Sequence, residues 1–278
     1  MQEAYNQRRS LGDQLNRQIM RDLRLYMLVG GMPQAVNTYL ATKNLSEVDQ
    51  TKREILELYN DDFRKIDSSG RIARLFRAIP SELAKNASRY QVTSVLGNNV
   101  NRVAIDEALA DLEDSLCVTC AYHAYAPSAG FALHKDIDRY KMFLADTGLF
   151  ITLAFWDKSA TDNIIYQKLL SDKLNADLGY VYENVVAQML TAAGHELYYH
   201  TWPTPSGKHN YEIDFLIMRG SKVCPIEVKS SGYKAHASLD AFAQKYSSQI
   251  AQSYLLYTKD LRRIGGVDYV PIYMTMML

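Results

Sequence analysis

The stretch YEIDFLIMRGSKVCPIEVK, residues 211–229, decides the fold of the C-terminal part of this chain. Two apolar runs rich in Ile, Val and Phe, 211–217 and 223–229, are typical of β-strands. Between them, Arg219-Gly220-Ser221 has the composition of a tight turn. The stretch therefore predicts a hairpin of two adjacent strands.

Charged side chains interrupt both apolar runs. Because successive side chains of a strand point to opposite faces, we expect Asp214 on the face opposite to Ile213 and Phe215. By the same alternation, Glu227 and Lys229 lie side by side on one face of the second strand. A buried charge is costly unless it is paired or bound to a metal. The hairpin is therefore expected to bring Asp214 and Glu227 together.

Two carboxylates at one edge of a sheet form a hard-oxygen site suited to Mg²⁺ or Mn²⁺, with Asp214 and Glu227 as the ligands. Lys229 can orient a water molecule or stabilise charge that develops on a phosphate. The upstream helix offers Glu183 as a further ligand at the rim of the core. The plainer alternative is a surface hairpin in which Lys229 forms a salt bridge with Asp214.

The surrounding residues, 170–278, predict an α/β domain with a mixed sheet. Helical spacing of apolar residues precedes the hairpin, and strand-like runs lie on both sides of it. The expected elements besides the hairpin are a helix at 177–193, a strand at 196–202, a helix at 236–247, a strand at 252–257 and an extended run at 269–276.

Residues 1–68 predict a helical segment. Apolar residues recur at helical spacing over 12–29, 33–41 and 46–65. Gly30-Gly31-Met32-Pro33 separates the first two helices, because glycine supplies a left-handed cap and proline cannot continue a helix.

Residues 69–155 have the element order of a winged helix-turn-helix domain, three helices followed by a hairpin. The three helices are expected within 71–115, and Ile72, Leu75, Phe76 and Ile79 give the first one a buried face. Extended runs follow at 117–125 and 140–145. The whole chain is therefore of the α+β or α/β class.

The third helix of the winged-helix-like domain is acidic. It carries five acidic residues and no basic residue between Asp106 and Asp114. Because phosphates repel such a helix, we expect this domain to contact protein or act as a spacer rather than read DNA. The basic stretch from Arg71 to Arg102 either touches a nucleic-acid backbone or neutralises the acidic helix, and we favour the second role.

The composition is that of an ordinary globular protein of 278 residues, 47% hydrophobic and 22% charged. Its 31 basic and 31 acidic residues cancel, which argues against a generic basic nucleic-acid binder but excludes no local site. No apolar run reaches the ~18 residues that suggest a membrane span, and the polar N-terminus does not resemble a signal peptide. Three cysteines argue against a disulfide framework. The sequence therefore predicts a cytoplasmic protein.

An acid on a helix, an Asp on a strand and Glu-x-Lys on the next strand resemble the PD-(D/E)XK nuclease superfamily. The resemblance implies a restriction-endonuclease-like domain that hydrolyses phosphodiesters with bound Mg²⁺ or Mn²⁺. It implies catalytic roles for Asp214, Glu227, Lys229 and Glu183, the first two as metal ligands. The proline that precedes the family's Asp is replaced here by Ile213.

Three further motifs, LVGGMPQAV at 28–36, IPSEL at 79–83 and FLADTGL at 143–149, are similar to a prokaryotic AAA-type ATPase family. In that family an ATPase domain precedes a domain of unknown function with a nuclease-like end. The phosphate-binding loop Gly-x4-Gly-Lys-Ser/Thr is absent here, since Gly207-Lys208 is the only Gly-Lys pair and lacks the upstream glycine. We therefore expect no ATP site and a chain that is a fragment or a stand-alone remnant.

Two functions remain open from the sequence. The first is metal-dependent hydrolysis of phosphodiesters, in DNA, in association with an AAA-type ATPase. The alternative is a catalytically inactive module of an ATPase that binds DNA or protein. The intact Asp, Glu and Lys set favours hydrolysis. The expected partners are DNA and an ATPase domain or another protein, without a membrane, and the sequence predicts no oligomeric state.

Overall fold

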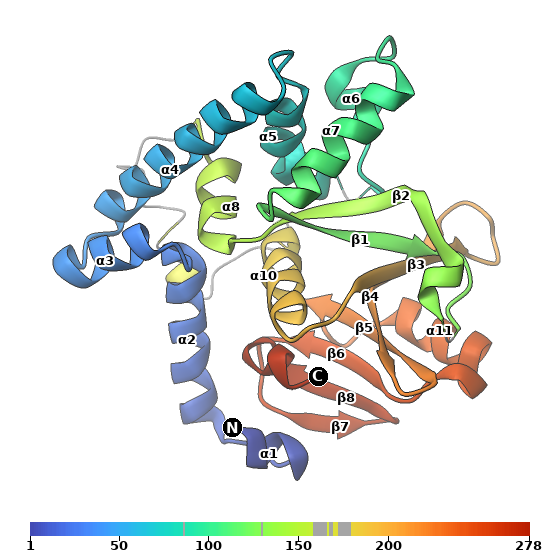
Figure 1. The fold of residues 1–278 in the computed structure, drawn as a ribbon. Coiled ribbons are helices and arrows are strands. Elements are labelled where there is room, and N and C mark those ends of the chain that lie inside the picture. Colours follow the sequence, from blue (N-terminus) through green and yellow to red (C-terminus); the bar gives the residue numbers. More distant parts are fainter. Residues whose placement is uncertain (86, 129, 158–165, 167–168, 172–178) are drawn as a thin grey trace. The chain divides into compact units, whose positions relative to one another are not determined.

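The computed structural model in Figure 1 describes residues 1–278 except 86, 129, 158–165, 167–168 and 172–178. The chain divides into two compact units, each assembled from separate segments. The sheet unit, as we call it, comprises Met1–Arg21, Cys120–Lys141 and Asn175–Leu278. The helical unit comprises Asp22–Thr119 and Met142–Leu174.

The sheet has eight strands in the order β2-β1-β3-β4-β5-β6-β8-β7. It is mixed, because β3, β4 and β5 are antiparallel neighbours, whereas β1 with β3, β5 with β6 and β6 with β8 pair in parallel. The strands are β1 (Val118–Ala124), β2 (Lys135–Leu144), β3 (Leu197–Pro203), β4 (Asn210–Arg219), β5 (Lys222–Lys229), β6 (Ser253–Tyr257), β7 (Arg262–Ile264) and β8 (Val267–Pro271). The expected mixed sheet of an α/β chain is confirmed.

Only the first part of the extended run expected at 269–276 forms a strand. Strand β8 ends at Pro271, and the 3-10 helix η4 (Ile272–Met277) follows it. The apolar run is buried in both parts, so hydrophobicity alone does not distinguish them. The short strand β7 was not anticipated either, because its three residues are exposed and carry no apolar pattern.

Helices pack on the sheet through apolar side chains. Helix α10 (Gly179–Ala192) contacts β3 and β5, and α11 (Ala237–Tyr246) contacts β4 and β5. Leu239 and Phe242 of α11 are fully buried in one hydrophobic cluster of the sheet unit. The smaller elements are the helix α1 (Gln2–Asn6) and the 3-10 helices η1 (Phe131–His134) and η3 (Ser247–Gln249).

The helical unit contains the helices that the sequence predicts, with bounds within one or two residues. They are most of α2 (Asp13–Val29), α3 (Pro33–Thr42), α4 (Leu45–Ile66), α5 (Arg71–Ala84), α6 (Val92–Leu96) and α7 (Arg102–Asp114). Helix α8 (Thr147–Ala154) belongs to the same unit, but the sequence did not predict it. The predicted face of α5 is buried at Ile72, Leu75, Phe76 and Ile79. Local signals explain the boundaries: Gly30 has a φ of +82°, and the Asn44 side chain caps α4 by accepting from Ser46 N.

The motifs around Gly30 and Asp146 meet in the helical unit. Asp146 caps α8 by accepting from Leu149 N at 2.8 Å, and its other oxygen accepts from Gly31 N at 2.6 Å. Gly148 and Gly30 approach so closely that a Cβ at Gly148 would lie 2.5 Å from the Cα of Gly30. These two sequence motifs therefore make one packing joint between α2 and α8.

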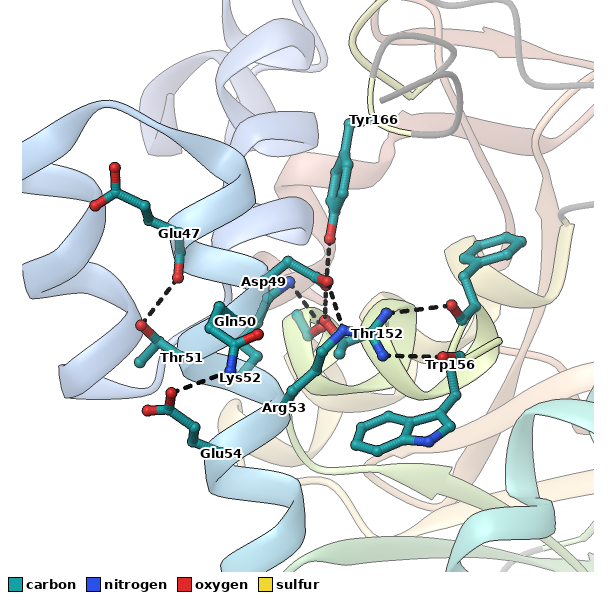
Figure 2. Close-up of polar contacts among 12 residues, drawn as sticks. Glu47, Asp49, Gln50, Thr51, Lys52, Arg53, Glu54, Thr152, Trp156 and Tyr166 are labelled. Atoms are coloured by element: carbon teal, nitrogen blue, oxygen red, sulfur yellow. Dashed lines mark hydrogen bonds and ion pairs between the residues drawn. The ribbon is translucent and has the colours of Figure 1, made fainter. Parts of the chain in front are cut away.

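A buried polar cluster joins α4 to α8 beside this joint (Figure 2). Asp49 is 2% exposed and accepts hydrogen bonds from Thr152, Tyr166 and Arg53. The guanidinium of Arg53 also donates to the carbonyl of Trp156, at 2.9 Å, just beyond the end of α8. Because each buried polar atom named here has a partner, the cluster stabilises the helical unit and leaves no reactive group free.

Lys52 lies in the same part of α4 and is fully buried. Its ammonium donates to the carbonyl of Leu28 at 2.6 Å and to that of Gly148 at 3.2 Å. Burial lowers the pKa of Lys52 to about 8, although the carboxylates of Asp49 and Asp146 oppose that shift. Lys52 thus ties together the two backbone segments that meet where Gly30 packs against Gly148.

Candidate functional site

The site that the sequence predicts lies in the sheet unit, where β4 is irregular. Tyr198 of β3 pairs with Leu216, but His200 pairs with Ile213, so β4 has one residue more than β3 over this stretch. Such a bulge breaks the alternation of side chains and redirects the residues in it. Ile213 and Leu216 accordingly belong to the same core cluster. The expectation that Ile213 and Phe215 share one face was wrong for this reason.

Asp214 lies within this irregular stretch and turns toward the neighbouring strand. Its Oδ2 accepts a hydrogen bond from Val228 N of β5 at 2.7 Å. Burial raises the pKa of Asp214 well above its usual range, and the negative charges of Glu183 and Glu227 raise it further. The structure therefore brings Asp214 into one electrostatic group with the two glutamates, as the sequence predicts.

Glu227 and Lys229 form the ion pair expected for neighbours on one face of β5. The ammonium of Lys229 lies 2.7 Å from Oε1 of Glu227, so it pairs with this residue and not with Asp214. Glu227 is 5% exposed, and its Oε2 is buried without a hydrogen-bond partner in the described part of the chain. A carboxylate oxygen in that position is costly to leave unsatisfied.

Glu183 lies in the second turn of α10, at a partly buried position between the buried Tyr182 and Asn184. Burial raises the pKa of Glu183; the charge of Lys141 opposes the shift, and those of Glu212 and Glu227 increase it. The helix acid therefore joins the same group of charges, at the rim that the sequence predicts.

The sequence did not predict two members of the group, Lys141 and Glu212. Lys141 is 7% exposed in β2, and its ammonium forms an ion pair with Oε1 of Glu212 in β4. A signal was present in each case. Lys141 interrupts the apolar run 140–144, and Glu212 lies two residues before Asp214 on the same strand. Only the tertiary structure shows that β2 and β4 bring these two residues to the same site.

Both lysines of the group are held in the charged form. For Lys229, burial would lower the pKa, but Glu227 and then Asp214 and Glu183 raise it above its ordinary value. For Lys141, the carboxylates of Glu212, Glu183 and Asp214 likewise outweigh burial and raise the pKa. Neither lysine is therefore available as a general base at neutral pH, and each acts as a fixed positive charge.

The group fits a divalent cation by its chemistry. Four carboxylates and two lysines leave a formal excess of two negative charges, and the raised carboxyl pKa values show that these charges repel each other. Oε2 of Glu227, which has no partner among the residues that the structure describes, offers an acceptor for such an ion. Among the described residues, no three His, Cys, Asp or Glu side chains are already arranged to hold a metal. Mg²⁺, however, is commonly held by one or two carboxylates and several waters.

Comparison with protein families gives two matches. Residues 20–160 match the family described as Domain of unknown function (DUF8612), and residues 178–274 match Domain of unknown function (DUF4143). DUF4143 is known to accompany AAA-type ATPases in prokaryotes. Searches among curated proteins and among solved structures gave no match. None of the described helices combines the length and apolar character needed to cross a lipid bilayer.

Proposed function

Because this chain belongs to the DUF8612 family, which matches half of its residues, and also carries a DUF4143 region, we propose a nuclease function associated with an AAA-type ATPase. In this proposal the sheet unit hydrolyses phosphodiesters of DNA with Mg²⁺ or Mn²⁺. The observation that carries it is Oε2 of Glu227, which is buried without a hydrogen-bond partner among the described residues, beside two carboxylates whose pKa values are raised. Such a group gains most from a divalent cation.

Asp214 and Glu227 would hold the cation, which when bound activates water and stabilises negative charge on the phosphate. Asp214 already has one oxygen fixed by Val228 N, so its remaining oxygen is the one available for the ion. Lys229 keeps Glu227 in place and presents a permanent positive charge toward the phosphate. Glu183 supplies a further carboxylate from α10.

The domain assignment forms part of the same proposal. Residues 170–278 would be a PD-(D/E)XK, restriction-endonuclease-like domain, preceded by a winged-helix-like domain at 69–155 and a helical segment at 1–68. The order α5, α6, α7, β1 and β2 is that of a winged helix. Strands β1 and β2 also extend the sheet of the C-terminal region, because β1 pairs in parallel with β3. Its acidic third helix, α7, suits contact with a protein better than contact with DNA.

A binding role without turnover is the second candidate. It is favoured by the lack, in the part of the chain that the structure describes, of three ligands already arranged for a metal. It is also favoured by the two ion pairs, which engage both lysines of the group. In this role the sheet unit would serve an ATPase by contacting DNA or a partner protein.

The two candidates are separated by a cleavage assay on linear, supercoiled, single-stranded and branched DNA with Mg²⁺ or Mn²⁺. We expect cleavage that stops with EDTA and falls by about 10²-fold or more in Asp214→Ala and Lys229→Ala, as for other lost transition-state contacts. Lys222→Ala, at the exposed other end of β5, is the matched control and should cleave normally. Cleavage that survives both site variants contradicts the assignment. DNA binding without cleavage supports the second candidate.

A further inference from the structure

Lys141 links the two family regions inside the sheet unit. It belongs to the part of the chain that matches DUF8612, whereas its partner Glu212 belongs to the part that matches DUF4143. The strand that carries Lys141 is at the edge of the sheet, beside β1, and β1 pairs in parallel with β3. The carboxylate group is therefore completed by a residue from outside the DUF4143 region.

Lys141 is more deeply buried than Glu212, its partner in the ion pair. Its side chain is 8% exposed, whereas that of Glu212 is 28% exposed. An exposed pair contributes little to stability, and a buried lysine is costly unless several negative charges offset it. The charge of Lys141 acts on Glu183 and Asp214 as well as on Glu212. Lys141 is thus placed to set the charge of the whole group.

The charge balance differs sharply with and without this lysine. With Lys141 and Lys229 present, the four carboxylates leave a formal charge of minus two, which one divalent cation neutralises. Without Lys141, Glu212 becomes a free carboxylate two residues from Asp214, and the formal charge becomes minus three. A second cation could then be held between the freed Glu212 and its neighbours.

We propose that Lys141 is a positioning residue that holds Glu212 out of the metal-binding set and limits the site to one divalent cation. This inference rests on the proposed function, because it assumes that the site binds a cation at all. Oε2 of Glu227, which is buried and has no partner among the described residues, is the acceptor left for that cation.

The test counts bound Mn²⁺ by calorimetry and by electron paramagnetic resonance on the full chain, without nucleic acid. We expect one ion in the wild type and in Lys141→Arg. We expect two ions, or a first ion bound about tenfold more tightly, in Lys141→Met, since one added charge can shift binding by about 1.4 kcal/mol. Lys141→Met/Glu212→Gln should return to one ion.

The outcomes separate this inference from the function. If the wild type binds no Mn²⁺, the proposed function itself fails. If the wild type binds one ion and folded Lys141→Met binds it with the same number and affinity, only the role of Lys141 fails. Glu212→Gln keeps the inference testable should Lys141→Met not fold. It should keep one ion with at most about a tenfold loss of affinity, whereas any larger loss would make Glu212 a ligand and overturn the inference.

Discussion

At the scale of single residues, the candidate site shows how burial and charge decide which side chains can act as acids, bases or fixed charges. Asp214 and Glu183 have raised pKa values, whereas Lys229 and Lys141 remain protonated. A sequence motif names residue types and spacing but not these protonation states. They follow from how deeply each group is buried and which charges surround it.

A histidine in the same unit gives a prediction about pH. His123 is 2% exposed, and its Nε2 accepts a hydrogen bond from Thr201 N, so the ring is neutral. Burial lowers the pKa of His123 to about 4, with smaller contributions from Arg139 and His200. Because the unfolded chain then binds a proton more readily than the folded one, stability is lost as the pH falls from the unfolded value of 6.5 toward 4.

We therefore expect the free energy of unfolding to drop by about 2 kcal/mol through His123 between about pH 7.5 and about pH 5. The measurement is urea unfolding at both pH values, for the wild type and for His123→Gln, whose amide oxygen can still accept from Thr201 N. The variant should lose less stability in acid than the wild type does. Equal losses in the two proteins would show that His123 titrates normally.

At the scale of elements, two irregular features position the functional and structural groups. The bulge in β4 turns Asp214 toward β5, where Val228 N fixes one of its oxygens. In the helical unit, Gly30 and Gly148 allow α2 and α8 to approach, and Asp146 ties the two ends together. In both places a backbone departure from regular geometry brings a carboxylate to its partners.

The glycine joint predicts a large difference between two similar substitutions. In Gly148→Ala the new Cβ would lie 2.5 Å from Gly30 Cα, so backbone has to shift, at a cost of about 1–3 kcal/mol. In Gly31→Ala the nearest atom would be Asp146 Oδ2 at 3.4 Å, an ordinary contact, and the cost should stay within about 0.5 kcal/mol. Denaturant midpoints of the two variants measure the difference, and equal midpoints would refute the joint.

At the scale of the whole molecule, the formal charge of zero hides a strongly charged site. The carboxylate group has a formal excess of two negative charges, which the rest of the chain balances. The sheet unit is also discontinuous in sequence, because strands β1 and β2 precede most of its residues by a long segment. The candidate site is therefore not built from one continuous piece of chain.

This discontinuity predicts the behaviour of a truncated protein. Residues 170–278 alone would lack β1, β2 and Lys141, and would expose the edge of β3, which is buried over Leu197–Trp202. An exposed apolar edge strand promotes aggregation. We expect the fragment to aggregate or melt well below the full chain, as measured by light scattering and a thermal scan. A soluble fragment with the same melting temperature would show that β1 and β2 are dispensable.

The sequence by itself determined most helices, most strands and the four site residues Glu183, Asp214, Glu227 and Lys229 as members of one group. It could do so because apolar periodicity and local caps act within a few residues. A charge inside an apolar strand is also conspicuous in sequence. The carboxylates of these residues share one electrostatic environment in the structure.

Only the tertiary structure decided the bulge at Asp214, the pairing of Lys229 with Glu227 and the arrival of Lys141 beside Glu212. Each of these depends on strand register or on strand order. Lys141 and Glu212 are 71 residues apart, and their contact requires that β1 and β2 join the sheet beside β3. Register and order are set by which apolar faces bury each other across long separations, and no local pattern in the sequence encodes that choice.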